Sequence, residues 1–172
     1  MNNIRSTIIK PVEHIDWPKI KEVHIRMLKE SPGAFVETLD EIEERTTEEW
    51  KNFTIEHVES LIKVAFLAFD DEGPCGFVRC DIDDPRAPPG AAMIDSLWVA
   101  AENRGTGLGY LLMQLAIDWI HEKYVPTVAL GVTGVNMQVI PFYKKLGFKP
   151  LGMTIGVPGQ REKLITVMGM RI

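Results

Sequence analysis

The segment Arg104–Gly109, which reads Arg-Gly-Thr-Gly-Leu-Gly, has the residue types and spacing of an anion-binding loop. It lies between the apolar run Met93–Ala101 and the helical pattern Tyr110–Tyr124. A glycine-rich turn between a strand and a helix exposes backbone amides and the positive end of the helix dipole. The side chain of Arg104 adds a positive charge beside them. We therefore predict a binding site for a phosphate or pyrophosphate group.

Two common phosphate-binding loops do not fit this spacing. The dinucleotide fingerprint Gly-x-Gly-x-x-Gly requires a third glycine where this chain has Tyr110. The nucleotide P-loop ends in Gly-Lys-Ser/Thr, whereas Gly109 is followed by Tyr110 and Leu111. The loop therefore lacks the lysine for a terminal phosphate and the hydroxyl for magnesium, which disfavours NAD and ATP as ligands.

The pattern Arg-x-x-Gly-x-Gly within Arg104–Gly109 resembles the pyrophosphate loop of the GNAT superfamily of N-acetyltransferases, which binds the diphosphate of acetyl-coenzyme A. A second match follows in the same order. Asn136 and then Pro141–Phe148 resemble the later motif of that superfamily, Asn…(Phe/Leu)-Tyr-x-x-x-Gly-Phe. Taken singly, these features also fit a tight turn, a packed tyrosine and a helix C-cap at Gly147. Their joint order from about Met93 to Leu151 favours the family.

The resemblance implies a role for each matching residue. The backbone of Leu97, Trp98 and Val99 would pair with the pantetheine arm, and one of their N–H groups would polarise the thioester carbonyl. Tyr143 would protonate the departing coenzyme A thiolate, and Asn136 would contact the pantetheine or orient the leaving group. The diphosphate would be bound by Arg104, Gly105, Thr106, Gly107, Leu108 and Gly109.

The reaction also needs a proton acceptor, because a primary alkylamine is mostly protonated at neutral pH. Asp95 occupies a strand position where many members of this superfamily carry a glutamate near the reacting centre. It is either a base acting through a water molecule or a hydrogen-bonded structural carboxylate. Strict alternation predicts that Asp95, Leu97 and Val99 share one face of the strand, with Ser96 and Trp98 on the other.

No Cys-His or Ser-His arrangement is apparent in the sequence. Direct transfer through a ternary complex is therefore favoured over a covalent acyl-enzyme. The alternative is a coenzyme A-binding regulatory module with little or no catalytic activity.

Composition limits the other classes of function. The chain has 172 residues with 45% hydrophobic and 25% charged side chains, which predicts one globular domain over residues 1–172. We expect a cytoplasmic protein, because no leader and no membrane-length apolar run is visible. The net charge of −5 disfavours nucleic acid as a partner. Cys75 and Cys80 are expected to be packed, reduced thiols, and the scattered histidines predict no metal site.

Capping and turn signals predict the elements that position these residues. Asp16 and Pro18 are typical of the start of a first helix, and Thr46 with Glu49 forms a capping box that opens a second. Two further helices are expected at about 107–123 and 136–147, with Pro141 causing either a late start or a kink in the last. Strands are expected at 4–10, 64–69, 75–81, 93–100, 128–132, 148–155 and 164–171.

This order of elements predicts an α/β fold. The central sheet is expected to be GNAT-like, mixed and mostly antiparallel, with one parallel strand–helix–strand unit and helices on both faces. The ligand site is expected where the two parallel strands diverge.

The acceptor is open at the level of sequence, and both a small molecule and a peptide amine fit. Phe35 either packs in the core or touches the substrate. The acidic residues between positions 37 and 49 form either a solvated face or a rim that attracts amines. The closing strands are a candidate edge for a homodimer, and a monomer fits equally well.

Overall fold

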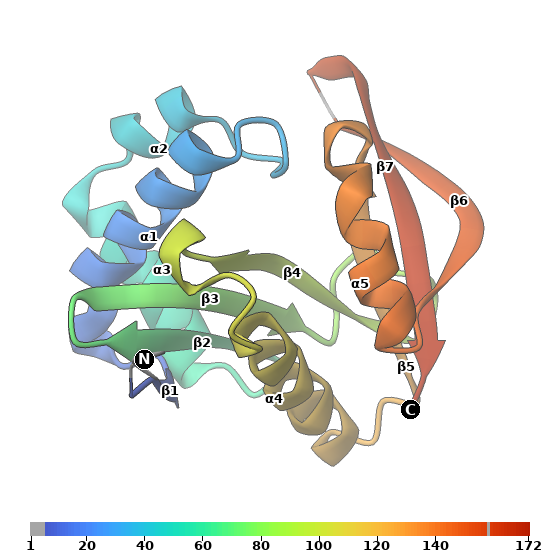
Figure 1. The fold of residues 1–172 in the computed structure, drawn as a ribbon, viewed down its shortest axis with the longest axis horizontal. Coiled ribbons are helices and arrows are strands. Elements are labelled where there is room, and N and C mark those ends of the chain that lie inside the picture. The colour runs from blue at the N-terminus through green and yellow to red at the C-terminus, as the bar shows by residue number, and fades with distance from the viewer. Residues whose placement is uncertain (1–5, 158) are drawn as a thin grey trace.

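The computed structural model describes residues 6–157 and 159–172, whose strands form one central sheet (Figure 1). The strand order is β1-β2-β3-β4-β5-β7-β6. Neighbouring strands are antiparallel except for β4 and β5, which are parallel. This arrangement confirms the predicted mixed sheet. The strands are β1 Ile8–Pro11, β2 Lys63–Asp70, β3 Gly73–Asp81, β4 Ala91–Val99, β5 Thr127–Thr133, β6 Lys149–Val157 and β7 Gln160–Arg171.

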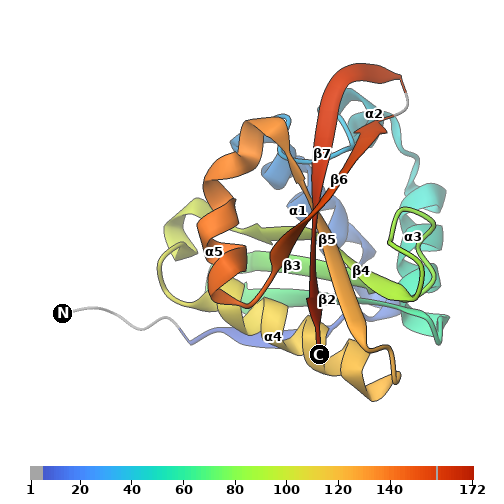
Figure 2. The same cartoon turned by 90° about the vertical axis from the view of Figure 1, so that its right-hand side faces the viewer.

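Helices cover both faces of this sheet, and Figure 2 shows α4 and α5 on one side and α3 on the other. On β3, the ring of Phe77 lies 5.1 Å from the ring of His24 in α1. The neighbouring Gly76 instead faces Leu112 of α4. The helices are α1 Trp17–Glu30, α2 Leu39–Glu44, α3 Thr47–Glu59, α4 Leu108–Glu122 and α5 Ile140–Lys145, with 3₁₀ turns η1 His14–Asp16, η2 Ala101–Asn103 and η3 Gly134–Val139.

The last helix begins later than position 136. Asn136 has a non-helical backbone (φ −113°, ψ 23°) inside η3, and α5 begins only at Ile140. Pro141 therefore stands in the first turn, where its missing N–H costs no hydrogen bond. The late start is thus the correct alternative of the two. At the other end of the chain, positions 4 and 5 of the first predicted strand lie outside the described residues.

Asp16 stands at the N-cap of α1 as predicted, but its side chain does not cap the helix. It accepts a hydrogen bond from the backbone N–H of Glu13 at 2.9 Å and pairs with Lys10 at 3.2 Å. The carboxylate therefore stabilises the preceding turn, η1.

The predicted capping box of α3 is present. The Thr46 hydroxyl accepts from the Glu49 N–H at 3.2 Å, and the Glu49 carboxylate accepts from the Thr46 N–H at 2.7 Å. We expect Thr46→Ala to lower the free energy of unfolding by about 1 kcal/mol, because the Glu49 N–H loses the hydroxyl that accepts its hydrogen bond. Urea denaturation measures the change. Thr47→Ala, at an exposed position one residue later, is the control and should change stability much less.

Both cysteines lie on β3 as free, buried thiols, as predicted. Burial raises the pKa of Cys75 to about 11 and raises that of Cys80 well above its usual value. Neither is therefore a thiolate at neutral pH. Separately, no helix within the described residues combines the length and the apolar character needed to cross a bilayer.

Candidate active site

β4 and β5 diverge at the centre of the sheet. They pair only between Ala91–Ile94 and Thr127–Leu130, although β4 continues to Val99 and β5 to Thr133. Beyond this point β5 remains paired with β7, so the edge of β4 from residue 95 onward that faces β5 has no strand partner. An extended ligand can pair with such an edge through backbone hydrogen bonds. The divergence of the two parallel strands thus creates a candidate binding edge, as predicted.

A β-bulge interrupts β4 at the same place. Phe77 of β3 lies opposite Trp98, but Arg79 lies opposite Asp95, so one residue of β3 faces two of β4. Ser96 takes up the extra length with a left-handed backbone, φ 56°.

The bulge overturns the predicted alternation of side chains. Asp95 and Trp98 point to the same face of the sheet, where they contact Arg79 and Arg26. Val99 instead lies on the face of α4, close to Gly109. The period-two rule fails here because one extra residue shifts the strand by one position.

Two cavities adjoin the divergence. The first, the loop cavity, has a volume of about 540 Å³ and lies between the end of β4, the loop before α4, and α5. The second, the inner cavity, has a volume of about 300 Å³ and lies between β4, β5, β7 and the segment 34–37. Both cavities are lined by Ala34, Phe35, Leu97, Asn136 and Tyr143. A ligand that follows β4 from the loop would therefore reach the inner cavity at these residues.

The glycine-rich loop has the backbone conformation on which the prediction of an anion site rests. Gly105 (φ 76°) and Gly107 (φ 92°) adopt the left-handed conformation that favours glycine, and Gly107 is the N-cap of α4. The Thr106 hydroxyl donates to the Asn103 carbonyl at 2.7 Å and accepts from the Leu108 N–H at 3.4 Å. These bonds hold the turn so that the helix N-terminus faces the loop cavity.

The loop cavity is lined by most, but not all, of the predicted coenzyme-binding residues. Thr106 and Leu108 are absent from its lining; Thr106 shapes the turn and Leu108 is buried in the core. The predicted residues that do line it are Leu97, Trp98, Val99, Arg104, Gly105, Gly107, Gly109, Asn136 and Tyr143.

Arg104 lines the loop cavity, but its charge is shared. Its Nε–H donates to the Val99 carbonyl at 3.0 Å, and its Nη2 donates to Glu30 at 3.2 Å. The predicted positive charge beside the loop is thus present, and it is paired with a carboxylate from α1. These contacts tie the loop to the end of β4.

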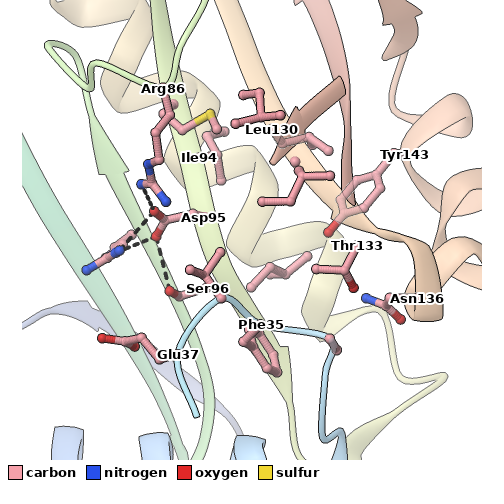
Figure 3. A pocket seen from close by; sticks show the side chains of 18 of the residues that line it. Phe35, Glu37, Arg86, Ile94, Asp95, Ser96, Leu130, Thr133, Asn136 and Tyr143 are labelled. Atoms are coloured by element: carbon pink, nitrogen blue, oxygen red, sulfur yellow. Dashed lines mark hydrogen bonds and ion pairs between the residues drawn. The ribbon is translucent and has the colours of Figure 1, made fainter. Parts of the chain in front are cut away.

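Tyr143, Asn136 and Thr133 surround the junction of the two cavities (Figure 3). Tyr143 is buried, and burial raises the pKa of its phenol to about 12, so the hydroxyl keeps its proton at neutral pH. The Asn136 carbonyl oxygen accepts from Gln138 at 3.0 Å. The Thr133 hydroxyl is buried without a hydrogen-bond partner among the described residues. The junction thus offers polar groups that a ligand can satisfy.

Asp95 lies at the other end of the inner cavity, fully engaged with cations (Figure 3). Its carboxylate accepts from Arg79 at 2.9 Å, from Arg86 at 2.6 Å and from the Ser96 hydroxyl at 3.1 Å. Burial alone would raise the pKa of Asp95, but the charges of Arg79 and Arg86 outweigh it and hold that pKa well below its usual range. A carboxylate with a low pKa is a weak base, so this environment suits the structural alternative for Asp95.

We therefore expect Asp95→Asn to lower the free energy of unfolding by about 2 kcal/mol at pH 7, because Arg79 and the more solvent-exposed Arg86 lose their shared carboxylate. A carboxylate whose pKa is lower in the folded than in the unfolded state stabilises the fold at pH values above its unfolded pKa, about 3.9. This stabilisation is lost as the pH falls from there through the folded-state pKa. The difference between wild type and variant should thus shrink below about pH 4. Urea denaturation of the wild type and the variant at pH 7 and below pH 4 measures this difference in the free energy of unfolding. Equal stabilities at pH 7 would contradict the structural role.

Several residues of the inner cavity were not predicted as site residues. Their positions in the sequence are far apart, and the β3–β4 and β4–β5 pairings together with the return of segment 34–37 bring them to one cavity. No local motif marks them. They are Arg79, Arg86 and Thr133, whereas Glu37 enters the sequence-based prediction only within the acidic stretch 37–49, as one end of a rim that attracts amines.

Similarity to known proteins agrees with this geometry. Residues 25–148 match the family model of the Acetyltransferase (GNAT) family. The fold is similar to the crystal structure of a GNAT-family acetyltransferase from Streptococcus pneumoniae, with a TM-score of 0.80 and 22% identity over 97% of this chain and 100% of that chain. It is also similar to the PaiA N-acetyltransferase of Thermoplasma acidophilum in complex with coenzyme A, with a TM-score of 0.73 and 20% identity over 97% and 99%.

A shorter segment is similar to a protein with a named activity. Sixty residues are 37% identical to streptothricin acetyltransferase from Streptomyces lavendulae, covering 35% of this chain and 32% of that protein. The matched segment thus spans about a third of that relative. The family model covers most of the chain, and the solved structures share its whole fold. The chain therefore belongs to the GNAT family of acetyltransferases.

Proposed function

We propose that this protein is an acetyl-CoA-dependent N-acetyltransferase that transfers the acetyl group directly to a primary amine in a ternary complex. The observation that carries the proposal is the meeting of the loop cavity and the inner cavity at Leu97, Asn136 and Tyr143. One cavity suits the donor and the other the acceptor. Their junction would hold the thioester and the amine next to each other, and such positioning of two reactants contributes much of the rate acceleration by enzymes.

The residues of the loop cavity fit acetyl-CoA. The N-terminus of α4 and the left-handed Gly105 and Gly107 suit a diphosphate, and the unpaired edge of β4 suits the pantetheine arm. Acetyl-CoA supplies an activated acetyl group as a thioester. A backbone N–H near Leu97 would polarise the thioester carbonyl. The amine nitrogen attacks the carbonyl carbon, the C–S bond breaks, and Tyr143 donates its proton to the departing sulfur.

Direct transfer is supported by the residues at the junction. The described residues that line the loop cavity and the inner cavity include neither cysteine nor histidine. The hydroxyl of Ser96 donates to Asp95, which is a poor base. No activated nucleophile is therefore available there to form an acyl-enzyme.

The closure of the inner cavity favours a small-molecule acceptor over a protein. The Gln160 side chain donates to the Val36 carbonyl at 3.0 Å, and the Lys163 ammonium donates to the Phe35 carbonyl. These bonds tie β7 to the segment 34–37 above a cavity of about 300 Å³. A folded protein terminus would have to separate them, whereas a small amine fits beneath. Phe35 lines both cavities, so we assign it to the wall of the site.

The experiment is to mix the protein with acetyl-CoA and a panel of amines and to follow the release of free thiol. The panel should include polyamines, amino acids, amine-bearing antibiotics and peptides with free N-termini or lysines. Turnover with small amines above that with peptides supports the proposal. Binding of acetyl-CoA without turnover on any amine would instead support the regulatory module.

A further inference from the structure

We propose that Glu37 is the carboxylate that binds the ammonium group of the acceptor and accepts its proton. This assignment rests on the proposed acetyl transfer and supplies the proton acceptor that Asp95 is poorly suited to be. Glu37 belongs to the segment between α1 and α2 and lines the inner cavity. In Figure 3 it lies on the opposite side of the cavity from Tyr143.

Glu37 also lines a third cavity of about 250 Å³, which we name the outer cavity. The outer cavity lies against α3 and is lined by polar residues that include His57, Lys63 and Asp81. The inner and outer cavities share four lining residues, which are Glu37, Arg79, Arg86 and Asp95. Glu37 therefore stands between the proposed acceptor space and a second cavity lined mainly by charged residues.

The two carboxylates of the inner cavity differ in how many of their oxygens already accept hydrogen bonds. Both oxygens of Asp95 accept hydrogen bonds from arginines. In Glu37, Oε1 accepts from Arg45 at 2.5 Å, and no hydrogen bond from a described residue reaches Oε2. The side chain is also only 26% exposed. Glu37 therefore has an oxygen available for an ammonium group in a partly desolvated setting, where such a charge pair is strengthened.

In this proposal, the proton leaves the amine at Glu37 and reaches the sulfur at Tyr143, on opposite sides of the cavity. The ammonium binds at Oε2 and gives one proton to Glu37, directly or through one water molecule, which leaves a neutral amine. Its lone pair forms the C–N bond as the C–S bond breaks. The remaining excess proton on nitrogen is lost to solvent. Tyr143 protonates the sulfur on the opposite side and regains its own proton from solvent. Glu37 returns its proton to solvent through the outer cavity.

Titratable and charged groups surround Glu37 on several elements. Burial lowers the pKa of His24 to about 4 and lowers that of His57, so both imidazoles are uncharged. The other charged residues that line the outer cavity with Glu37 are Arg45, Glu56, Lys63, Arg79, Asp81, Asp84, Arg86 and Asp95. The arginines keep their protons throughout the range of an assay.

Glu37→Gln tests the assignment, with Glu44→Gln as the matched control at an exposed carboxylate of α2 that lines none of these cavities. The measurement is kcat/KM for the best amine of the panel across pH, together with the Kd of acetyl-CoA. We expect Glu37→Gln to lower kcat/KM about 100-fold, to remove the acidic limb of the pH profile and to leave the Kd unchanged. Glu37→Asp should restore part of the rate and the limb.

Arg45→Lys separates catalysis from structure, because it weakens the ion pair but keeps the carboxylate. A variant Glu37→Gln with the wild-type rate and pH profile would overturn the assignment while leaving the proposed transfer standing. A similar loss in Arg45→Lys without a change in the profile would also overturn it, in favour of a structural ion pair. Transfer to no amine by the wild-type protein would overturn the proposed function itself.

Discussion

Replacing Tyr143 with phenylalanine is expected to lower kcat about 100-fold and to leave the Kd of acetyl-CoA unchanged. The reason is that the phenol supplies a proton to the departing thiolate, and general acid catalysis of this kind contributes about 10² to 10⁴. Its pKa of about 12 keeps the phenol protonated across the usual assay range. Phenylalanine preserves the packed ring beside Phe142 and Phe148, so the fold should be retained.

Tyr124→Phe is the control, because Tyr124 is almost fully exposed and lines neither the loop cavity nor the inner cavity. The steady-state rate of thiol release measures kcat, and equilibrium titration with acetyl-CoA measures the Kd. A Tyr143→Phe variant with undiminished kcat would remove the phenol from the mechanism. A variant that loses coenzyme affinity instead would assign Tyr143 to binding.

Replacing Gly107 with aspartate is expected to weaken acetyl-CoA binding about 30-fold. Two like charges about 4 Å apart repel by about 4 kcal/mol at an effective dielectric constant of 20. Solvent screening at this exposed loop reduces the repulsion to about 2 kcal/mol, which corresponds to the stated factor. The new carboxylate would stand at the N-cap of α4, where the diphosphate is proposed to bind.

Gly90→Asp provides the matched control for backbone strain. Gly90 has a similar left-handed backbone (φ 77°) and open surroundings, but it lies in the β3–β4 loop away from α4. Both variants should lose similar amounts of stability, and only Gly107→Asp should lose affinity. Equal affinities in a calorimetric titration would show that the diphosphate does not bind at this loop.

Local signals account for the part of the fold that the sequence predicted. The capping box at Thr46 and Glu49 involves contacts only three residues apart, so it is readable without the fold. The same holds for the left-handed glycines before α4 and for the turn between β2 and β3. These features determine where helices and strands begin and end, including the loop that is predicted to bind an anion.

Contacts between distant segments account for what the sequence did not show. The bulge at Ser96 depends on how β4 pairs with β3. It exchanges the faces of the sheet to which the side chains beyond Asp95 were predicted to point. The ion pair of Arg104 joins it to Glu30, which is 74 residues away. The same applies to Asp95, whose role changes once Arg79 and Arg86 are seen beside it. Ion pairs of this kind leave no periodic pattern.

The most direct test of the central claim is the initial-velocity pattern with acetyl-CoA and the best amine of the panel varied together. Because donor and acceptor are proposed to occupy adjoining cavities at the same time, double-reciprocal plots should give intersecting lines. The acetylated amine should be the product, and mass spectrometry of the protein mixed with acetyl-CoA alone should show no acetylated enzyme. Parallel lines together with an acetyl-enzyme that passes its acetyl group to the amine would contradict direct transfer at this junction.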